Sequence, residues 1–366
     1  MGGAGIRRLL GRFGSALAAC QAGPRAWPAA SIGATVCQAA SQLDGALIEA
    51  DRRWLSEPDH HCLRFTDPLF PPQLAEAPAP PALLFLRGNP DWLCQPQIAV
   101  VGSRHPTAGG KDNAYAFSRA LAESGLLITS GLAEGVDSAA HRAALDVGRP
   151  TLAVLGTGVD RIYPPRNHEL AAAVAANGAL ISEFPPGTGA RREHFPRRNR
   201  IVVGLSLGTL VIEAALQSGA LISARQAVEA GREVFALPGS IHNPLARGCH
   251  RLIREGAHLV ETAGEIIELL RPAGWRLGDQ LNQRLADRSQ CPPAATQQAP
   301  TLPNGLPHDP DYRQLWQALE HSPASAAQLQ ERTGLTAPAL SSMLLRLELE
   351  GLVEARGGRY QLHKAS

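Results

Sequence analysis

Short apolar runs alternate with longer amphipathic stretches through the middle of the chain, from residue 94 to residue 271. The apolar runs end at glycine, serine or proline, whereas the stretches between them carry apolar residues at helical spacing. This alternation predicts an α/β fold with a parallel sheet wrapped by helices. We expect its strands at residues 98–101, 126–129, 151–155, 179–182, 201–203, 210–212 and 233–236.

The amino-terminal flank has a different pattern. Residues 1–57 predict short helices, one near residues 7–14 after the turn Gly3-Ala4-Gly5 and another near residues 41–55. Such a turn beside basic residues suits a helix-hairpin-helix that presents backbone N–H groups to a phosphate. A small helical protein-interaction module fits the same pattern equally well. Residues 63–89 are rich in proline and predict an extended arm that closes with one strand at Leu83-Leu84-Phe85-Leu86.

The carboxyl-terminal flank is divided by composition. Residues 272–307 are rich in proline, glutamine and alanine, which predicts a flexible linker. Residues 308–366 predict a winged helix, with helices at residues 311–321, 325–333 and 337–349 and a two-stranded wing at residues 352–362. The predicted domains are therefore residues 1–57, 58–271, 272–307 and 308–366.

Polar and basic residues follow several predicted strands directly. Gly102-Ser103-Arg104 follows the first strand and resembles a phosphate loop, with glycine for close approach, a hydroxyl donor and a cation. It lacks the glycine spacing and the acidic ribose clamp of a dinucleotide site, so we expect no NAD and no other cofactor. Thr157 and Arg166 follow the third strand, and Glu183 follows the fourth.

The densest basic cluster lies at residues 191–200, Arg-Arg-Glu-His-Phe-Pro-Arg-Arg-Asn-Arg. Guanidinium groups can fork onto phosphates, and a phenyl face such as that of Phe195 can stack on a base. Because parallel strands end at one edge of a sheet, we expect this cluster to join the other strand-end loops in one anion-binding site.

Asp137 and His141 lie four residues apart and share one face of a predicted helix. The pair could form a catalytic dyad or part of a metal site. The alternative is a helix N-terminal cap and a hydrogen-bonded histidine that fixes the loop, and we favour it because no third ligand is evident. The six cysteines form no C-x-x-C pair, so we expect no metal site.

Composition and charge limit the kinds of partner and function that are possible. The net charge of the 366-residue chain is only +2, so an anionic partner must meet a local basic patch. No apolar segment has the length that a membrane span requires, and we expect a cytoplasmic protein without membrane contact. The chain also lacks a nucleophile elbow and paired carboxylates near the basic loops, which favours a binder over an enzyme.

These motifs together resemble the DNA-processing protein A family (DprA, also called Smf). The resemblance is strong over roughly residues 60–270. Its motifs are Val101-Gly102-Ser103-Arg104, residues 130–141 and 153–158, Asp160, Tyr163-Pro164, Ser182-Glu183-Phe184-Pro185, Phe195-Pro196-Arg197-Arg198-Asn199-Arg200, Gly204-Leu205-Ser206, Glu213-Ala214, Ser218-Gly219, Pro238-Gly239 and Gly248-Cys249-His250.

The resemblance implies an extended Rossmann-like, doubly wound sheet with a SAM-like helical start and a winged-helix end. It implies a non-catalytic protein that binds single-stranded DNA, forms a homodimer and loads RecA during natural transformation. The implied DNA-binding residues are Ser103, Arg104, Thr157, Arg166, Arg192, Phe195, Arg197, Asn199 and Arg200. The implied dimer contacts are Leu216, His250, Ile253 and Leu259.

Two other functions stay open at this stage. Gly208-Thr209 with Glu213 faintly resembles the lysine-decarboxylase-like Rossmann proteins, which would make the chain a nucleotide-binding N-glycoside hydrolase with Glu213 as its acid. A purely structural interaction protein is the third possibility.

Overall fold

The computed structural model divides into two compact units, Met1–Gln290 and Cys291–Ser366, and each is described here by itself. The structure describes residues 3–40, 45–290, 314–315, 318–319, 324–335, 340, 343–344, 347, 353–356 and 359–362. Within these ranges, no helix combines the length and the apolar character that crossing a bilayer would need.

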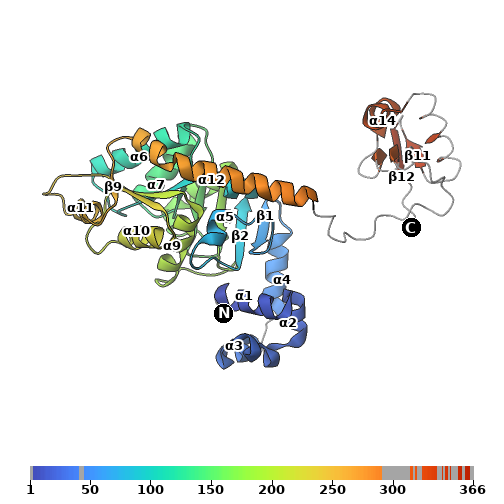
Figure 1. Ribbon diagram of the computed structural model, residues 1–366, viewed down its shortest axis with the longest axis horizontal. Helices are drawn as coiled ribbons and strands as arrows, with labels where there is room; N and C mark the ends of the chain where they lie inside the picture. The colour runs from blue at the N-terminus through green and yellow to red at the C-terminus, as the bar shows by residue number, and fades with distance from the viewer. Residues whose placement is uncertain are drawn as a thin grey trace. The chain divides into compact units, whose positions relative to one another are not determined.

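A nine-stranded sheet forms the centre of the first unit (Figure 1). Its order is β1-β2-β6-β5-β4-β3-β7-β8-β9. The strands β3 to β9 pair in parallel, whereas β1 and β2 add an antiparallel edge. The strands are β1 (His60–Arg64), β2 (Leu83–Gly88), β3 (Gln97–Val101), β4 (Leu127–Ser130), β5 (Thr151–Val154), β6 (Ala179–Ser182), β7 (Gly208–Val211), β8 (Glu233–Ala236) and β9 (His258–Leu259).

Helices cover both faces of this sheet, as a doubly wound fold requires. The alternation along β3 sends Ala99 and Val101 into one core and Ile98 and Val100 into the other. The first core is covered by α5 (Pro72–Glu76), α9 (His194–Leu205), α10 (Gly219–Glu229) and α11 (Arg247–Arg254). The second is covered by α6 (Ala108–Glu123), α7 (Val136–Asp146) and α12 (Ala263–Gln290) (Figure 1). The helix α8 (His168–Asn177) packs beside α7.

The predicted α/β fold and most of its strands are confirmed, but the strand expected at residues 201–203 is wrong. These residues belong to α9, and Ile201, Val202 and Val203 are all buried. α9 packs between the sheet and α5, where a Cβ on Gly204 would lie 2.8 Å from Leu74 Cδ1. A helix covered on two sides carries consecutive apolar residues, and over so short a run this pattern resembles a buried strand.

The amino-terminal residues form short helices, as expected: α1 (Gly3–Phe13), α2 (Ala16–Ala22), the 3₁₀ helix η1 (Pro24–Ala30), α3 (Ala34–Ala40) and α4 (Gly45–Leu55). The turn expected at Gly3-Ala4-Gly5 is wrong, because these residues form the first turn of α1. Leu9 and Ile32 share a small core with Trp27, whose indole Nε1 donates to the Ala19 carbonyl at 2.8 Å. Arg7 Nη1 donates to the Pro80 carbonyl at 2.6 Å, which ties α1 to the proline-rich arm.

The linker does not begin at residue 272 as expected, because α12 continues through Pro272 to Gln290. Its side chains Ile266, Leu270 and Leu277 are buried against the sheet. Farther along α12, Arg284 Nη1 donates to the Phe70 carbonyl at 2.9 Å. These contacts offset the roughly 3 kcal/mol by which an interior proline disfavours a helix. The linker predicted from composition is therefore wrong for residues 272–290, which are helical.

The second unit contains a three-stranded sheet of order β10-β12-β11, made by β10 (Ala324–Ser325), β11 (Val353–Arg356) and β12 (Arg359–Leu362). Its helix α14 (Ala326–Thr333) begins with a capping box between Ser325 and Gln328. The predicted helix at residues 325–333 and the wing strands are thus present. The helices expected at residues 311–321 and 337–349 lie largely outside the described residues.

The turn before β6 yields a test of the packing. A Cβ on Gly178 would lie 2.0 Å from the Thr151 carbonyl oxygen, so Gly178→Ala must displace backbone. We expect the free energy of unfolding in urea to fall by about 1–3 kcal/mol. In the control Gly274→Ala, inside α12, the added Cβ meets nothing within 4 Å and stability should rise by about 0.5–1 kcal/mol. Equal stability of Gly178→Ala and the wild-type chain would contradict this packing.

Candidate functional site

A hollow at the strand ends lies where the strand order reverses, between β3 and β7. Strands β3 to β6 follow one another in the sheet on one side of this point, and strands β7 to β9 follow one another on the other side. Parallel α/β sheets bind ligands at this position, beyond the carboxyl ends of the two strands. A cavity of about 720 Å³ lies here, lined by Gly102, Ser103 and Arg104 after β3 and by Gln217 and Ser218 after β7.

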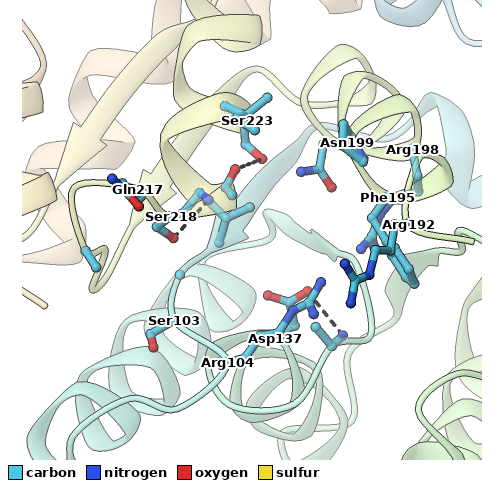
Figure 2. A pocket seen from close by; sticks show the side chains of 18 of the residues that line it. Ser103, Arg104, Asp137, Arg192, Phe195, Arg198, Asn199, Gln217, Ser218 and Ser223 are labelled. Carbon is cyan, nitrogen blue, oxygen red and sulfur yellow. Dashed lines mark hydrogen bonds between the residues drawn. The ribbon is translucent and has the colours of Figure 1, made fainter.

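The far wall of the cavity comes from α9 and the loop before it. In Figure 2, Gln217 and Ser218 lie on one side of the cavity. Arg192, Phe195 and Asn199 lie on the other. The guanidinium carbon of Arg104 lies 5.5 Å from the centroid of the Phe195 ring, within cation–π distance. The cavity therefore combines cations, an aromatic face and neutral hydrogen-bonding groups.

The loop after β3 is held by the start of α7 and by a hydrogen bond within the loop itself. Val136 N donates to the Ser103 carbonyl at 3.2 Å. Gly135 has φ +81°, and a Cβ there would lie 2.5 Å from the same carbonyl oxygen, so this contact requires glycine. Ser103 Oγ accepts a hydrogen bond from His105 N at 3.1 Å. The Gly-Ser-Arg loop is therefore shaped before any ligand binds.

Glu213, after β7, fixes the start of α6 relative to the sheet. Its carboxylate accepts hydrogen bonds from Thr107 N at 2.9 Å, Thr107 Oγ1 at 2.7 Å and Asn243 Nδ2 at 3.0 Å. The side chain is buried and is not among the residues that line the cavity. This arrangement gives Glu213 a structural role, which weakens the hydrolase alternative that needed it as a catalytic acid.

A buried guanidinium forms the floor of the cavity. Arg198 is 5% exposed, and its Nη1 donates to the Val154 carbonyl at 2.7 Å. Its Nη1 atom lies only 1.7 Å from the point where a side chain on Gly131 would place its Cβ, so glycine is required there. Burial lowers the pKa of Arg198 to about 10, and the nearby Asp137 carboxylate opposes this shift. The group therefore stays protonated at neutral pH.

Asp137 and His141 both stabilise the local fold. Asp137 Oδ2 accepts hydrogen bonds from the backbone N–H groups of Gly131 and Ala133 at 3.1 and 3.2 Å. His141 Nδ1 lies 2.8 Å from Thr151 Oγ1, which itself donates to the Ile128 carbonyl. The hydrogen-bonded histidine is as expected, but Asp137 is not the N-terminal cap of α7, because Gly135 occupies that position and Asp137 bonds the loop before the helix.

Five of the nine predicted DNA-binding residues line this cavity: Ser103, Arg104, Arg192, Phe195 and Asn199. The other four do not line it. Thr157 is buried and donates to the Arg161 carbonyl, and Arg166 lines a neighbouring groove.

Arg197 and Arg200 instead bind Glu183 Oε2, at 3.3 and 2.5 Å, and Arg200 also donates to the Ala79 carbonyl. Helix geometry explains this division. Residues 195 and 199 are four apart and share the face of α9 that borders the cavity, whereas residues 197 and 200 share another face. An extended loop would not have separated the cluster in this way.

Several cavity residues were missing from the sequence-based set. They are Tyr163, Arg198, Gln217, Ser218 and Ser223. The Ser218-Gly219 pair carried a usable signal, since Ser218 Oγ accepts from Ala220 N at 3.2 Å and caps the start of α10. Nothing in the sequence indicates that Arg198, unlike Arg197 and Asn199, is buried.

The four predicted dimer residues lie around α11. His250 Nε2 is 2.9 Å from the Gly239 carbonyl oxygen, and Ile253 packs against the first core. Leu216 and Leu259 are each 48% exposed. Ile253 shares α11 with His250, and Leu259 lies in β9 beyond its end, as expected.

A doubly wound sheet with this strand-end cavity and these loops matches the family model described as DNA recombination-mediator protein A, over residues 61–271. Residues 292–359 match the model of the DprA winged helix domain. The chain belongs to the DNA recombination-mediator protein A family, DprA/Smf.

Particular relatives agree with this assignment. The chain is 42% identical to Protein Smf of Escherichia coli K12 over 314 residues, covering 86% of this chain and 80% of that protein. It is 45% identical to DNA processing protein DprA of Streptococcus pneumoniae over 201 residues, covering 55% of this chain and 71% of that protein.

Two solved structures are similar. The X-ray structure of Streptococcus pneumoniae DprA matches with a TM-score of 0.58 and 41% identity, over 62% of this chain and 78% of that chain. DNA processing protein A from Helicobacter pylori matches with a TM-score of 0.53 and 30% identity, over 58% of this chain and 96% of that chain. That structure concerns the single-stranded DNA binding mode of the Helicobacter protein.

Because His141 is buried, the free energy of unfolding should depend on pH in the acid range. Burial, reinforced by the Arg198 charge, lowers the pKa of His141 to about 3 from its ordinary value of 6.5. Between these values the unfolded chain binds a proton that the folded chain does not. The free energy of unfolding should therefore fall with decreasing pH, by up to about 1.4 kcal/mol per pH unit below about pH 6.5.

Urea unfolding at several pH values, compared between wild type and His141→Gln, checks this. The variant should lose that part of the pH dependence, whatever its stability at neutral pH. Identical slopes for the two proteins would contradict the assignment of a neutral, buried His141.

Proposed function

We propose that this protein binds single-stranded DNA in the strand-end cavity and acts without catalysing a reaction on it. The observation that carries the proposal is that Arg104, which lies over the Phe195 ring, and Arg192 line the same open cavity. Within residues 3–40 and 45–290, no carboxylate lies within 4.0 Å of either guanidinium group. Both cations are therefore available for phosphates.

The chemistry of the walls favours a single strand. Phosphates would meet Arg104 and Arg192, and the N-terminal end of α10, at Gly219, adds a positive dipole end. An unpaired base can stack on Phe195, whereas the bases of a duplex are already stacked on one another. The single-stranded DNA binding mode described for the similar Helicobacter pylori protein supports this choice.

The remaining roles rest on family membership. We propose that the protein protects incoming DNA and loads RecA during natural transformation and recombination, as a cytoplasmic homodimer joined through Leu216, His250, Ile253 and Leu259. We further propose that the helical start, the Rossmann-like sheet and the winged helix are separate domains. Thr157, Arg166, Arg197 and Arg200, which do not line the cavity, are retained as DNA-binding candidates outside it.

Substitutions of two cavity residues test the DNA-binding proposal. Phe195→Ala should weaken binding of a thymidine oligomer by about 1–3 kcal/mol through lost stacking. Arg192→Ala should weaken binding and reduce the slope of log affinity against log salt by about 0.7. Fluorescence anisotropy measures both, and Arg225→Ala, an exposed arginine of α10 outside the cavity lining, is the charge-matched control. Wild-type affinity for duplex equal to that for single strands would refute the proposal.

A substitution at an exposed leucine tests the homodimer. Leu259→Glu places a charge in the proposed interface, where it would be buried without a partner, so the dimer should dissociate. Light scattering on a size-exclusion column should then report the mass of one chain instead of two. Leu47→Glu, at a more exposed leucine of α4, is the control and should leave the dimer intact. A wild-type chain that is monomeric at every concentration would rule out the homodimer.

A further inference from the structure

A second hollow, of about 450 Å³, opens beside the cavity and shares Arg104 with it. We call it the basic groove. Its other cations come from three separate elements, Lys111 from α6, Arg142 from α7 and Arg166 from η3 (Pro165–Asn167), and His105 lies among them. All four cations are exposed, so they can reach a ligand without rearrangement of the core.

The charges of the basic groove are poorly neutralised by the protein itself. Glu134 is the carboxylate on its wall, and it lies 4.0 Å from Arg166. Among residues 3–40 and 45–290, no carboxylate lies within 4.0 Å of the charged nitrogens of Lys111 or Arg142. Farther along α6, by contrast, Arg119 pairs with Glu123 at 3.0 Å. The groove therefore presents a local excess of positive charge, which suits a polyanion.

The groove and the cavity are joined by a third, smaller hollow of about 180 Å³. It is lined by Tyr163 and Phe195, whose ring centroids are 5.6 Å apart, and by Arg104, which borders all three hollows. A chain of alternating bases and phosphates matches this sequence of surfaces. Bases can stack on the two aromatic rings, while phosphates meet cations on either side.

We propose that the basic groove binds the backbone phosphates of single-stranded DNA that continues from the cavity past Arg104, with Lys111 and Arg142 as its principal contacts. This rests on the proposed function of the cavity. Lys111 supplies a compact charge and Arg142 a planar fork, and neither distinguishes one base from another. The groove therefore adds affinity for longer strands without adding sequence preference.

Oligomers of two lengths distinguish binding in the cavity from binding in the basic groove. An oligomer of about 5 thymidines fills the aromatic part and the cavity, whereas one of about 20 also reaches the groove. The double variant Lys111→Ala/Arg142→Ala should bind the long oligomer about 3- to 20-fold more weakly and lower its salt slope by about 1.4. Its affinity for the short oligomer should equal that of the wild type.

Fluorescence anisotropy on the full chain measures both lengths at several salt concentrations. Arg119→Ala on α6 is the control for lost charge and should leave both affinities unchanged. If the double variant binds the long oligomer like wild type while Arg192→Ala loses binding, the proposed role of the basic groove is overturned. The proposed function of the cavity then still stands. An equal loss for both lengths would also overturn the role of the groove, because the groove would then not be an extension. If Arg192→Ala binds both oligomers like wild type, the proposed function itself fails.

Discussion

The burial of one guanidinium determines how the rest of the site is arranged. Arg198 extends from α9 across the ends of the strands, donates to the Val154 carbonyl and occupies the space left by the missing side chain of Gly131. Asp137 provides the opposing charge nearby. Because a buried ion is tolerated only with such compensation, this contact fixes both the position and the rotation of α9. The rotation in turn decides which of the clustered arginines can reach the cavity.

The opposite wall is fixed by hydrogen bonds to another buried ionisable group. Glu213 accepts three hydrogen bonds from Thr107 and Asn243, and thereby joins the end of β7 to the start of α6. The Gly-Ser-Arg loop lies between these elements and is also bonded to Val136. The two walls are therefore rigid before a ligand arrives, which limits the conformational entropy lost on binding.

The sequence predicted the sheet well because its strands are buried on both faces and bounded by turn residues. The prediction was wrong at α9 because this helix is also buried. Ile201, Val202 and Val203 are buried on all sides, so the run of apolar residues shows no helical period. That single error placed the basic cluster in a loop. Arg197 and Arg200 entered the predicted site through the family resemblance, whereas the helix directs them to Glu183.

Burial was the other quantity that the sequence could not supply. Arg197 and Arg198 are adjacent and chemically identical, yet the first is largely exposed and the second is buried. Only the packing of α9 on the strand ends separates them. The motif of small residues at Ser218-Gly219 was visible in the sequence, but its position across from Arg192 depends on the strand order, which the sequence does not state (Figure 2).

Ion pairing divides the basic residues of this face into two kinds. Arg197, Arg200 and Arg119 each contact a carboxylate, so their charge is already neutralised within the fold. Arg104 and Arg192 contact none among the described residues near them, although repulsion between neighbouring cations disfavours such an arrangement. In a chain whose net charge is only +2, local cations without partners are not explained by overall basicity. Their persistence is explained if an anionic strand supplies the missing charge, and the sharing of Arg104 by three adjoining hollows gives that strand a continuous path.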